Sequence, residues 1–186
     1  MDKKAILFWR DKYDREEDLY NKGEEEELRG KFRKNGHITK DDLRKIIGWK
    51  FQGQLIPRGR IFLKYVEEAD EEFVRDLSKL AFKTRNEETR IRLFCMIRGV
   101  GPAIASVILA FYDPENYGVL DIHAWRELFG KEPKDLFTNA KHIAGYFERL
   151  REISRRVGLP ARDVEKALFK KNYDESKPNG RRGHVF

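Results

Sequence analysis

The chain has 186 residues, of which 40% are hydrophobic and 38% are charged, a balance too apolar for a disordered chain and too charged for an integral membrane protein. Its longest apolar run, residues 103–112, is about half the length of a bilayer-spanning helix, and the charges from Arg10 onward interrupt the opening segment too early for a signal peptide. Cys95 is the single cysteine, which excludes an internal disulfide. We therefore expect an intracellular protein of the cytoplasm or nucleoid, without a membrane partner.

The charge is basic and unevenly distributed. There are 39 Lys and Arg against 32 Asp and Glu, a net charge of +7, but residues 1–30 carry −3 and the remainder +10. A basic body favours a polyanion such as duplex DNA, because each neutralised phosphate releases counterions. The abundance of Lys and Glu, with only two glutamines, also resembles the ion-pair-rich surface of a thermophile protein, which explains the charge without DNA.

Apolar residues recur at helical spacing along nearly the whole chain, and strand-like alternation is nearly absent, so we expect an all-α fold. The opening helix carries a loose apolar stripe and ends near Gly23, after which the acidic run 24–27 begins a second, short helix. Thr39 predicts the start of a third helix, with Asp42 as its partner in a capping box. Residues 53–59, which include a proline, predict a loop.

Further helices follow this loop. One ends near Asp70, and another begins after Asn86, which we expect to cap it. Between them lies an amphipathic helix whose apolar face we expect to be buried. That face consists of Phe73, Val74, Leu77, Leu80 and Ala81. A long helix stops at Gly158, as is typical of a glycine C-cap, and a last helix spans residues 161–173.

Residues 97–110 differ from ordinary helical-bundle sequence. A helix ends at Ile97 or Arg98, a Gly-Val-Gly turn follows, and Pro102 begins the next helix, where its missing N–H has no cost. The glycines let a ligand approach the backbone, and free amides at a helix start form a site for an anion such as phosphate. A plain glycine-linked helical hairpin without a ligand explains the pattern equally well.

The turn and the segment beyond it resemble a known family. Gly99-Val100-Gly101, followed by a helix rich in Ala, Val, Ile and Leu, is similar to a helix-hairpin-helix element. Residues 117–126 resemble the Val-Asp-x-His segment of the HhH-GPD superfamily of DNA glycosylases. Asp121 lies eighteen residues after Ala103, close to the family's separation between its hairpin lysine position and its aspartate. The resemblance covers residues 94–129.

This resemblance implies that Asp121 is the catalytic carboxylate of a DNA glycosylase. A carboxylate beside the anomeric carbon stabilises the positive charge that develops as the N-glycosidic bond breaks, and it can orient or deprotonate the attacking water. The base must first be flipped out of the stack. Asp121 is also a good N-cap for a helix over residues 122–129, and this structural explanation is compatible with the catalytic one.

Some residues depart from the family's pattern. Bifunctional members carry a Schiff-base lysine where this chain has Ala103, which cannot act as a nucleophile, so we expect a monofunctional enzyme unless another lysine, such as Lys83 or Lys141, reaches the site. A lone Cys95 implies no four-cysteine iron–sulfur cluster. Histidine spacing predicts no metal site. Hairpin carbonyls hold a monovalent cation in some similar proteins, and the resemblance implies such a site at residues 97–102 of this chain. We expect no other cofactor.

The residues that we expect to bind DNA lie in the Gly-Val-Gly turn, beside it, or at the start of the helix that Pro102 begins. They are Arg98, Gly99, Val100, Gly101, Ala103 and Ile104. Gln52 or Gln54 is a candidate wedge for the space left by a flipped base, although solvated glutamines beside a buried Trp49 are the more frequent arrangement. His123 is more often structural than functional in such a position.

Together these observations predict a compact, two-lobed helical monomer that removes a damaged or mismatched base from duplex DNA. Residues 1–173 form one helical domain, with the helix-hairpin-helix at about 87–112, and residues 174–186 form a basic, mobile tail. The alternative is a non-catalytic helix-hairpin-helix DNA-binding protein, and Pro114 to Asp121 also resembles a poorly characterised set of such proteins. A nucleoside-processing protein and a helical protein with no nucleic-acid role stay open.

Overall fold

The computed structural model describes residues 1–16, 22–51 and 57–177. Within these ranges every regular element is a helix and none is a strand, which confirms the all-α class for the described chain. The candidate wedge residues Gln52 and Gln54 lie outside the described residues, as does the end of the basic tail from residue 178 onward.

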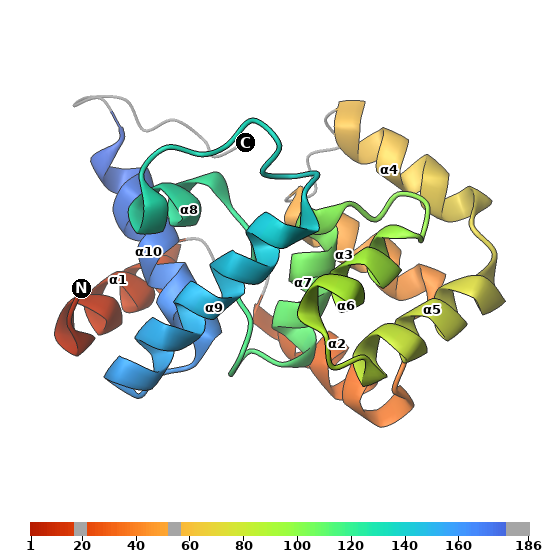
Figure 1. The fold of residues 1–186 in the computed structure, drawn as a ribbon, viewed down its shortest axis with the longest axis horizontal. Coiled ribbons are helices and arrows are strands. Elements are labelled where there is room, and N and C mark those ends of the chain that lie inside the picture. The colour runs from red at the N-terminus through yellow and green to blue at the C-terminus, as the bar shows by residue number, and fades with distance from the viewer. Residues whose placement is uncertain (17–21, 52–56, 178–186) are drawn as a thin grey trace.

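Ten helices make up the described chain. In order they are α1 (Lys3–Glu16), α2 (Lys22–Asn35), α3 (Lys40–Lys50), α4 (Pro57–Glu68), α5 (Glu71–Lys83), α6 (Glu87–Cys95), α7 (Pro102–Tyr112), α8 (Ile122–Phe129), α9 (Ala140–Val157) and α10 (Ala161–Glu175). Figure 1 shows α1, α8 and α10 gathered on one side and α4 and α5 on the other. The first and last helices therefore share one side, because α10 packs on α1, α8 and α9.

Side chains at the helix ends explain several boundaries. The Thr39 hydroxyl accepts from the Asp42 amide and the Asp42 carboxylate accepts from the Thr39 amide, which confirms the predicted capping box. Asn86 accepts from the Thr89 amide at the start of α6, and Gly158 ends α9 in the left-handed conformation with φ 65°. These caps are local features, so the sequence was sufficient to predict them.

Other boundaries differ from the prediction. Gly23 lies in the first turn of α2 instead of ending the first helix, because glycine tolerates a helix start as well as a helix end. Pro57 begins α4 instead of lying in a loop, as suits a residue that lacks an amide hydrogen. The last helix continues to Glu175, beyond the predicted end at residue 173.

The amphipathic helix α5 is only partly covered. Phe73 and Leu80, which we expected to be buried, are 46% and 53% exposed, while Val74 and Ala81 are fully buried. The apolar face of α5 is wider than the strip that its main neighbour, α6, can cover.

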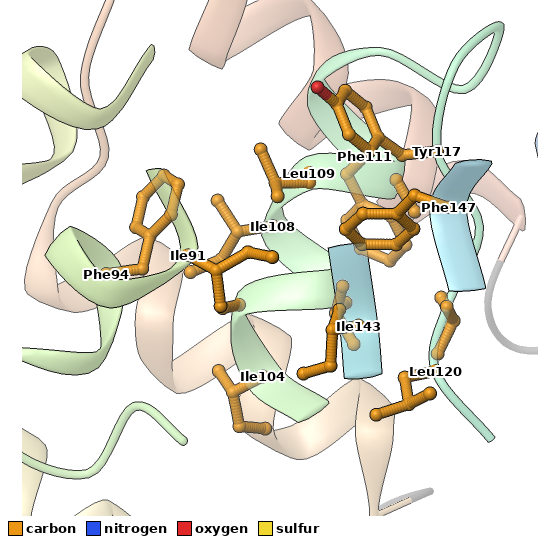
Figure 2. Close-up of a cluster of buried hydrophobic side chains, with 14 of the residues drawn as sticks. Ile91, Phe94, Ile104, Ile108, Leu109, Phe111, Tyr117, Leu120, Ile143 and Phe147 are labelled. Carbon is orange, nitrogen blue, oxygen red and sulfur yellow. The ribbon is translucent and has the colours of Figure 1, made fainter. Parts of the chain in front are cut away.

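The centre of the core is α7, the apolar run that is too short to span a bilayer. Nine of its eleven residues are buried, and it packs against α2, α3, α6 and α9. Figure 2 shows Ile104 and Ile108 of α7 beside Ile91 of α6 and Ile143 of α9. None of the helices in the described ranges combines the length and apolar character needed to cross a membrane. The start of α7 is therefore a rigidly held point from which a site can be built.

Candidate functional site

The turn between α6 and α7 (residues 96–101, called the hairpin below) is held against α4. Gly99 has φ +90°, and a Cβ there would lie 3.1 Å from both the Phe62 carbonyl oxygen and the Tyr65 Cβ. The Val100 amide donates to the Ile97 carbonyl oxygen at 2.9 Å, which closes the turn. Glycine at position 99 thus meets two needs, a left-handed backbone and close packing under α4.

The first amides of α7 lack a side-chain cap. Gly101 is the N-cap residue, and no side chain caps the helix there. Gly101 and Ala103 are half-buried, whereas Val100 and Ile104 are buried, so the latter two can contribute to a ligand only through their backbone. The arrangement offers amide donors at the positive end of a helix dipole, as an anion site requires.

Arg98 is exposed but already has partners. Its guanidinium pairs with the Glu68 carboxylate at 2.7 Å and lies 4.6 Å from the centre of the Tyr65 ring. The predicted phosphate-binding charge is therefore partly neutralised by α4, and a phosphate would have to compete with Glu68.

The extended segment before α8, residues 117–121, lies between helices, and side chains satisfy its backbone. The Val119 amide donates to Glu165 at 3.2 Å, and the Tyr146 hydroxyl donates to the Val119 carbonyl oxygen at 2.9 Å. The Leu120 amide donates to the Ser106 hydroxyl at 2.8 Å, and the Lys50 ammonium donates to the Leu120 carbonyl oxygen at 3.2 Å. Side chains from α3, α7, α9 and α10 thus fix the residues before Asp121.

Ser106 connects this segment to the hairpin helix. Its hydroxyl donates to the Ala103 carbonyl oxygen at 2.6 Å while it accepts from the Leu120 amide. The start of α7 and the residue before Asp121 are therefore joined through one buried side chain. From the sequence we expected Ser106 only to allow close helix packing, and this link was missed.

Gly118 allows α10 to approach the segment. A Cβ on Gly118 would lie 2.6 Å from the Glu165 Cβ and 2.8 Å from the Leu150 Cδ1, distances that the packing can accommodate only by shifting. Gly118→Ala should therefore lower the free energy of unfolding by about 1–3 kcal/mol, the usual effect of overpacking.

Urea unfolding of Gly118→Ala measures this effect, and Gly145→Ala is the matched control. Gly145 lies in α9, and among the described residues no heavy atom outside that helix lies within 4 Å of the point where a Cβ would be. Alanine there should leave stability unchanged or raise it by up to about 1 kcal/mol. Equal stability of the two variants would show that the segment is free to move away from α10.

Asp121 is the N-cap of α8, as expected. Its Oδ1 accepts from the His123 amide at 2.8 Å, and its Oδ2 lies 3.8 Å from the Lys50 Nζ. The Asp121 side chain is 23% exposed and that of Lys50 is 19% exposed. One carboxylate oxygen therefore serves the helix, while the other faces an amine at a point that solvent still reaches.

Lys50 is the residue that sequence reasoning missed. It is the last residue of α3, and its contact with Leu120 spans 70 positions, so no local pattern could connect it with Asp121. Among the described residues, neither Lys83 nor Lys141, the lysines considered from the sequence, forms an ion pair with Asp121.

A buried ion cluster includes Glu165, the residue that accepts from the Val119 amide of this segment. The Arg162 guanidinium pairs with Glu165 and, at 3.2 Å, with Glu25, and all three side chains are almost fully buried. Burial raises the pKa of the Glu165 carboxyl, and the positive charge of Arg162 offsets part of that rise. Burial also raises the pKa of Tyr146 well above its ordinary value, which keeps its hydroxyl a donor to Val119.

The contacts of His123 indicate a structural role. Its Nδ1 lies 3.0 Å from the Asn172 Oδ1, and its ring packs edge-on against Phe169 and Tyr173 of α10. In the part of the chain that the structure describes, no three His, Cys, Asp or Glu residues gather in a way that could hold a metal ion.

In comparison with known proteins, no protein-family model, no curated protein and no solved structure matches this chain.

Proposed function

We propose that this protein binds duplex DNA and removes a damaged or mismatched base by cleaving its N-glycosidic bond. The observation that carries the proposal is the position of Asp121, whose second carboxylate oxygen is not used by the α8 cap and is partly accessible. The neighbouring backbone is held by side chains from α3, α7, α9 and α10. A fixed carboxylate of this kind suits a reaction in which positive charge develops on a sugar carbon.

The hairpin would hold the DNA backbone beside this carboxylate. The α7 amides without a side-chain cap supply donors for a phosphate, and Ser106 ties that helix start to the Asp121 segment. A phosphate held at the hairpin and a sugar held at Asp121 would thus be positioned by one rigid unit. The net charge of +7 favours the same polyanionic partner.

A second candidate is a non-catalytic DNA-binding protein. It is favoured by the fact that both Asp121 oxygens already have a structural neighbour, the His123 amide for one and the Lys50 ammonium for the other. An N-cap aspartate paired with a lysine needs no catalytic role to explain it.

A panel of lesion-containing duplexes separates the two candidates. Purified protein is incubated at several temperatures with duplexes that carry 8-oxoguanine, uracil, hypoxanthine or an alkylated purine, and abasic products are scored after alkali. We expect an abasic site in at least one duplex. Salt-sensitive binding of every duplex without an abasic product from any of them would favour the non-catalytic candidate.

A further inference from the structure

We infer that Lys50 provides a nucleophilic amine at this site and that the protein cleaves the DNA strand at an abasic deoxyribose through an imine. The inference rests on the proposed function, because it places the same sugar beside Asp121. It replaces the sequence-based expectation of a monofunctional enzyme, which considered only the absence of a lysine at position 103 and the lysines at 83 and 141.

The Lys50 amine is fixed beside Asp121. The Lys50 Nζ donates to the Leu120 carbonyl oxygen at 3.2 Å and lies 3.8 Å from the Asp121 Oδ2, with the side chain four-fifths buried. Lys50 is the last residue of α3, and this helix packs against α4 and α7. Most surface lysines extend freely into solvent, whereas this amine is held in place and its side chain keeps some exposure.

Lys45 on the same helix has a different environment. Lys45 is 34% exposed and pairs at 2.8 Å with Glu27, whose side chain is 58% exposed. That pair is an ordinary surface ion pair. Lys50 instead faces the Leu120 carbonyl oxygen and the Asp121 carboxylate. Asp121 is the residue to which the proposed chemistry is assigned.

Strand cleavage through Lys50 needs only groups that the site and the abasic DNA supply. The neutral Lys50 amine adds to the C1′ aldehyde of an abasic deoxyribose, and loss of water gives a protonated imine. Removal of a C2′ proton then breaks the C3′–O bond, the 3′-side strand leaves as a 5′-phosphate, and water later releases the amine from the unsaturated sugar. Asp121 accepts the proton that the Lys50 ammonium loses and returns it to the hydroxyl that leaves as water. It is then again a carboxylate, which can stabilise the positive imine and take the C2′ proton. No oxidant or metal is needed.

Borohydride trapping tests the inference without knowledge of the lesion. A duplex with a single abasic site is incubated with the full-length protein and sodium borohydride, which reduces an imine to a stable amine. We expect a covalent protein–DNA adduct, with the DNA remnant mapped by mass spectrometry to Lys50. Lys50→Gln and Lys50→Arg should form less than about 1% of the wild-type adduct.

The variants separate a nucleophile from a mere positive charge. Lys50→Arg keeps a charge beside Asp121 but forms no such imine, so an adduct in this variant would overturn the inference. Lys45→Gln is the matched control on α3 and should trap as the wild type does. Circular dichroism and thermal unfolding verify that each Lys50 variant is folded before its loss of adduct is counted.

Two results distinguish this inference from the proposed function. If the wild type releases a base in the duplex panel but forms no adduct with abasic DNA, the Lys50 inference is wrong and the proposed function stands. If the adduct forms at Lys50 but no base is released from any lesion, the amine is confirmed and base removal is contradicted.

Discussion

Asp121→Asn should lower base release by about 100-fold or more while duplex affinity stays within about twofold of the wild type. Loss of one preorganised electrostatic group commonly lowers kcat by about 10²–10³, whereas affinity comes mainly from phosphate contacts elsewhere. Asparagine has nearly the same shape, and its side-chain oxygen can still accept from the His123 amide. The α8 cap therefore survives, since Asp and Asn are equally good N-caps.

Single-turnover base release and salt-dependent duplex binding measure the two parts of this prediction. Asp70→Asn is the matched control, because Asp70 caps α5 through the Phe73 amide at 2.8 Å and plays no part in the proposed site. It should leave both quantities unchanged. Undiminished base release by Asp121→Asn would remove Asp121 from the chemistry.

Arg162→Met should have the largest effect on stability. It leaves Glu25 and Glu165 buried without the guanidinium that pairs with both, and breaking a buried ion pair from one side typically costs about 3–5 kcal/mol. Glu165 also accepts from the Val119 amide. Loss of the Arg162 guanidinium should therefore disturb residues 117–121 and slow base release by the protein that is still folded.

Urea unfolding measures the stability part, and Arg44→Met is the matched control. Arg44 forms a two-pronged pair with Glu67 at 2.5 and 2.7 Å. The two side chains are 39% and 56% exposed, so the loss of this pair should change the free energy of unfolding little. Similar losses for the two variants would mean that solvent reaches the Arg162 cluster. Arg162 also lines a cavity of about 260 Å³ with residues of α1 and α2. This cavity is a route by which solvent could reach the cluster, and the comparison with Arg44→Met tests whether it does.

The features that could be predicted from the sequence are local ones. The Thr39 capping box, the Asn86 and Asp121 caps and the Gly158 C-cap depend on residues within a few positions of one another. Helical periodicity likewise identified α7 as an apolar helix, although its place at the centre of the core depends on its neighbours.

The features that could not be predicted depend on contacts between distant segments. Phe73 has the spacing of a buried residue, yet its exposure is decided by whether another helix covers that side of α5. Ser106 shows no signal of its bond to Leu120, and Lys50 ends α3 in a pattern typical of any helix end. The sequence indicated Asp121 as the acidic residue of the site, whereas the Lys50 amine beside it is evident only in the structure.

Direct detection of a free base tests the central claim most directly. The wild type and Asp121→Asn are incubated with each duplex of the panel, and the free base is quantified by chromatography and mass spectrometry alongside abasic sites. The account predicts that the wild type releases one free base for each abasic site, whether that site is intact or already cleaved, and that Asp121→Asn releases almost none. Duplex binding without any free base, or equal release by both proteins, would contradict it.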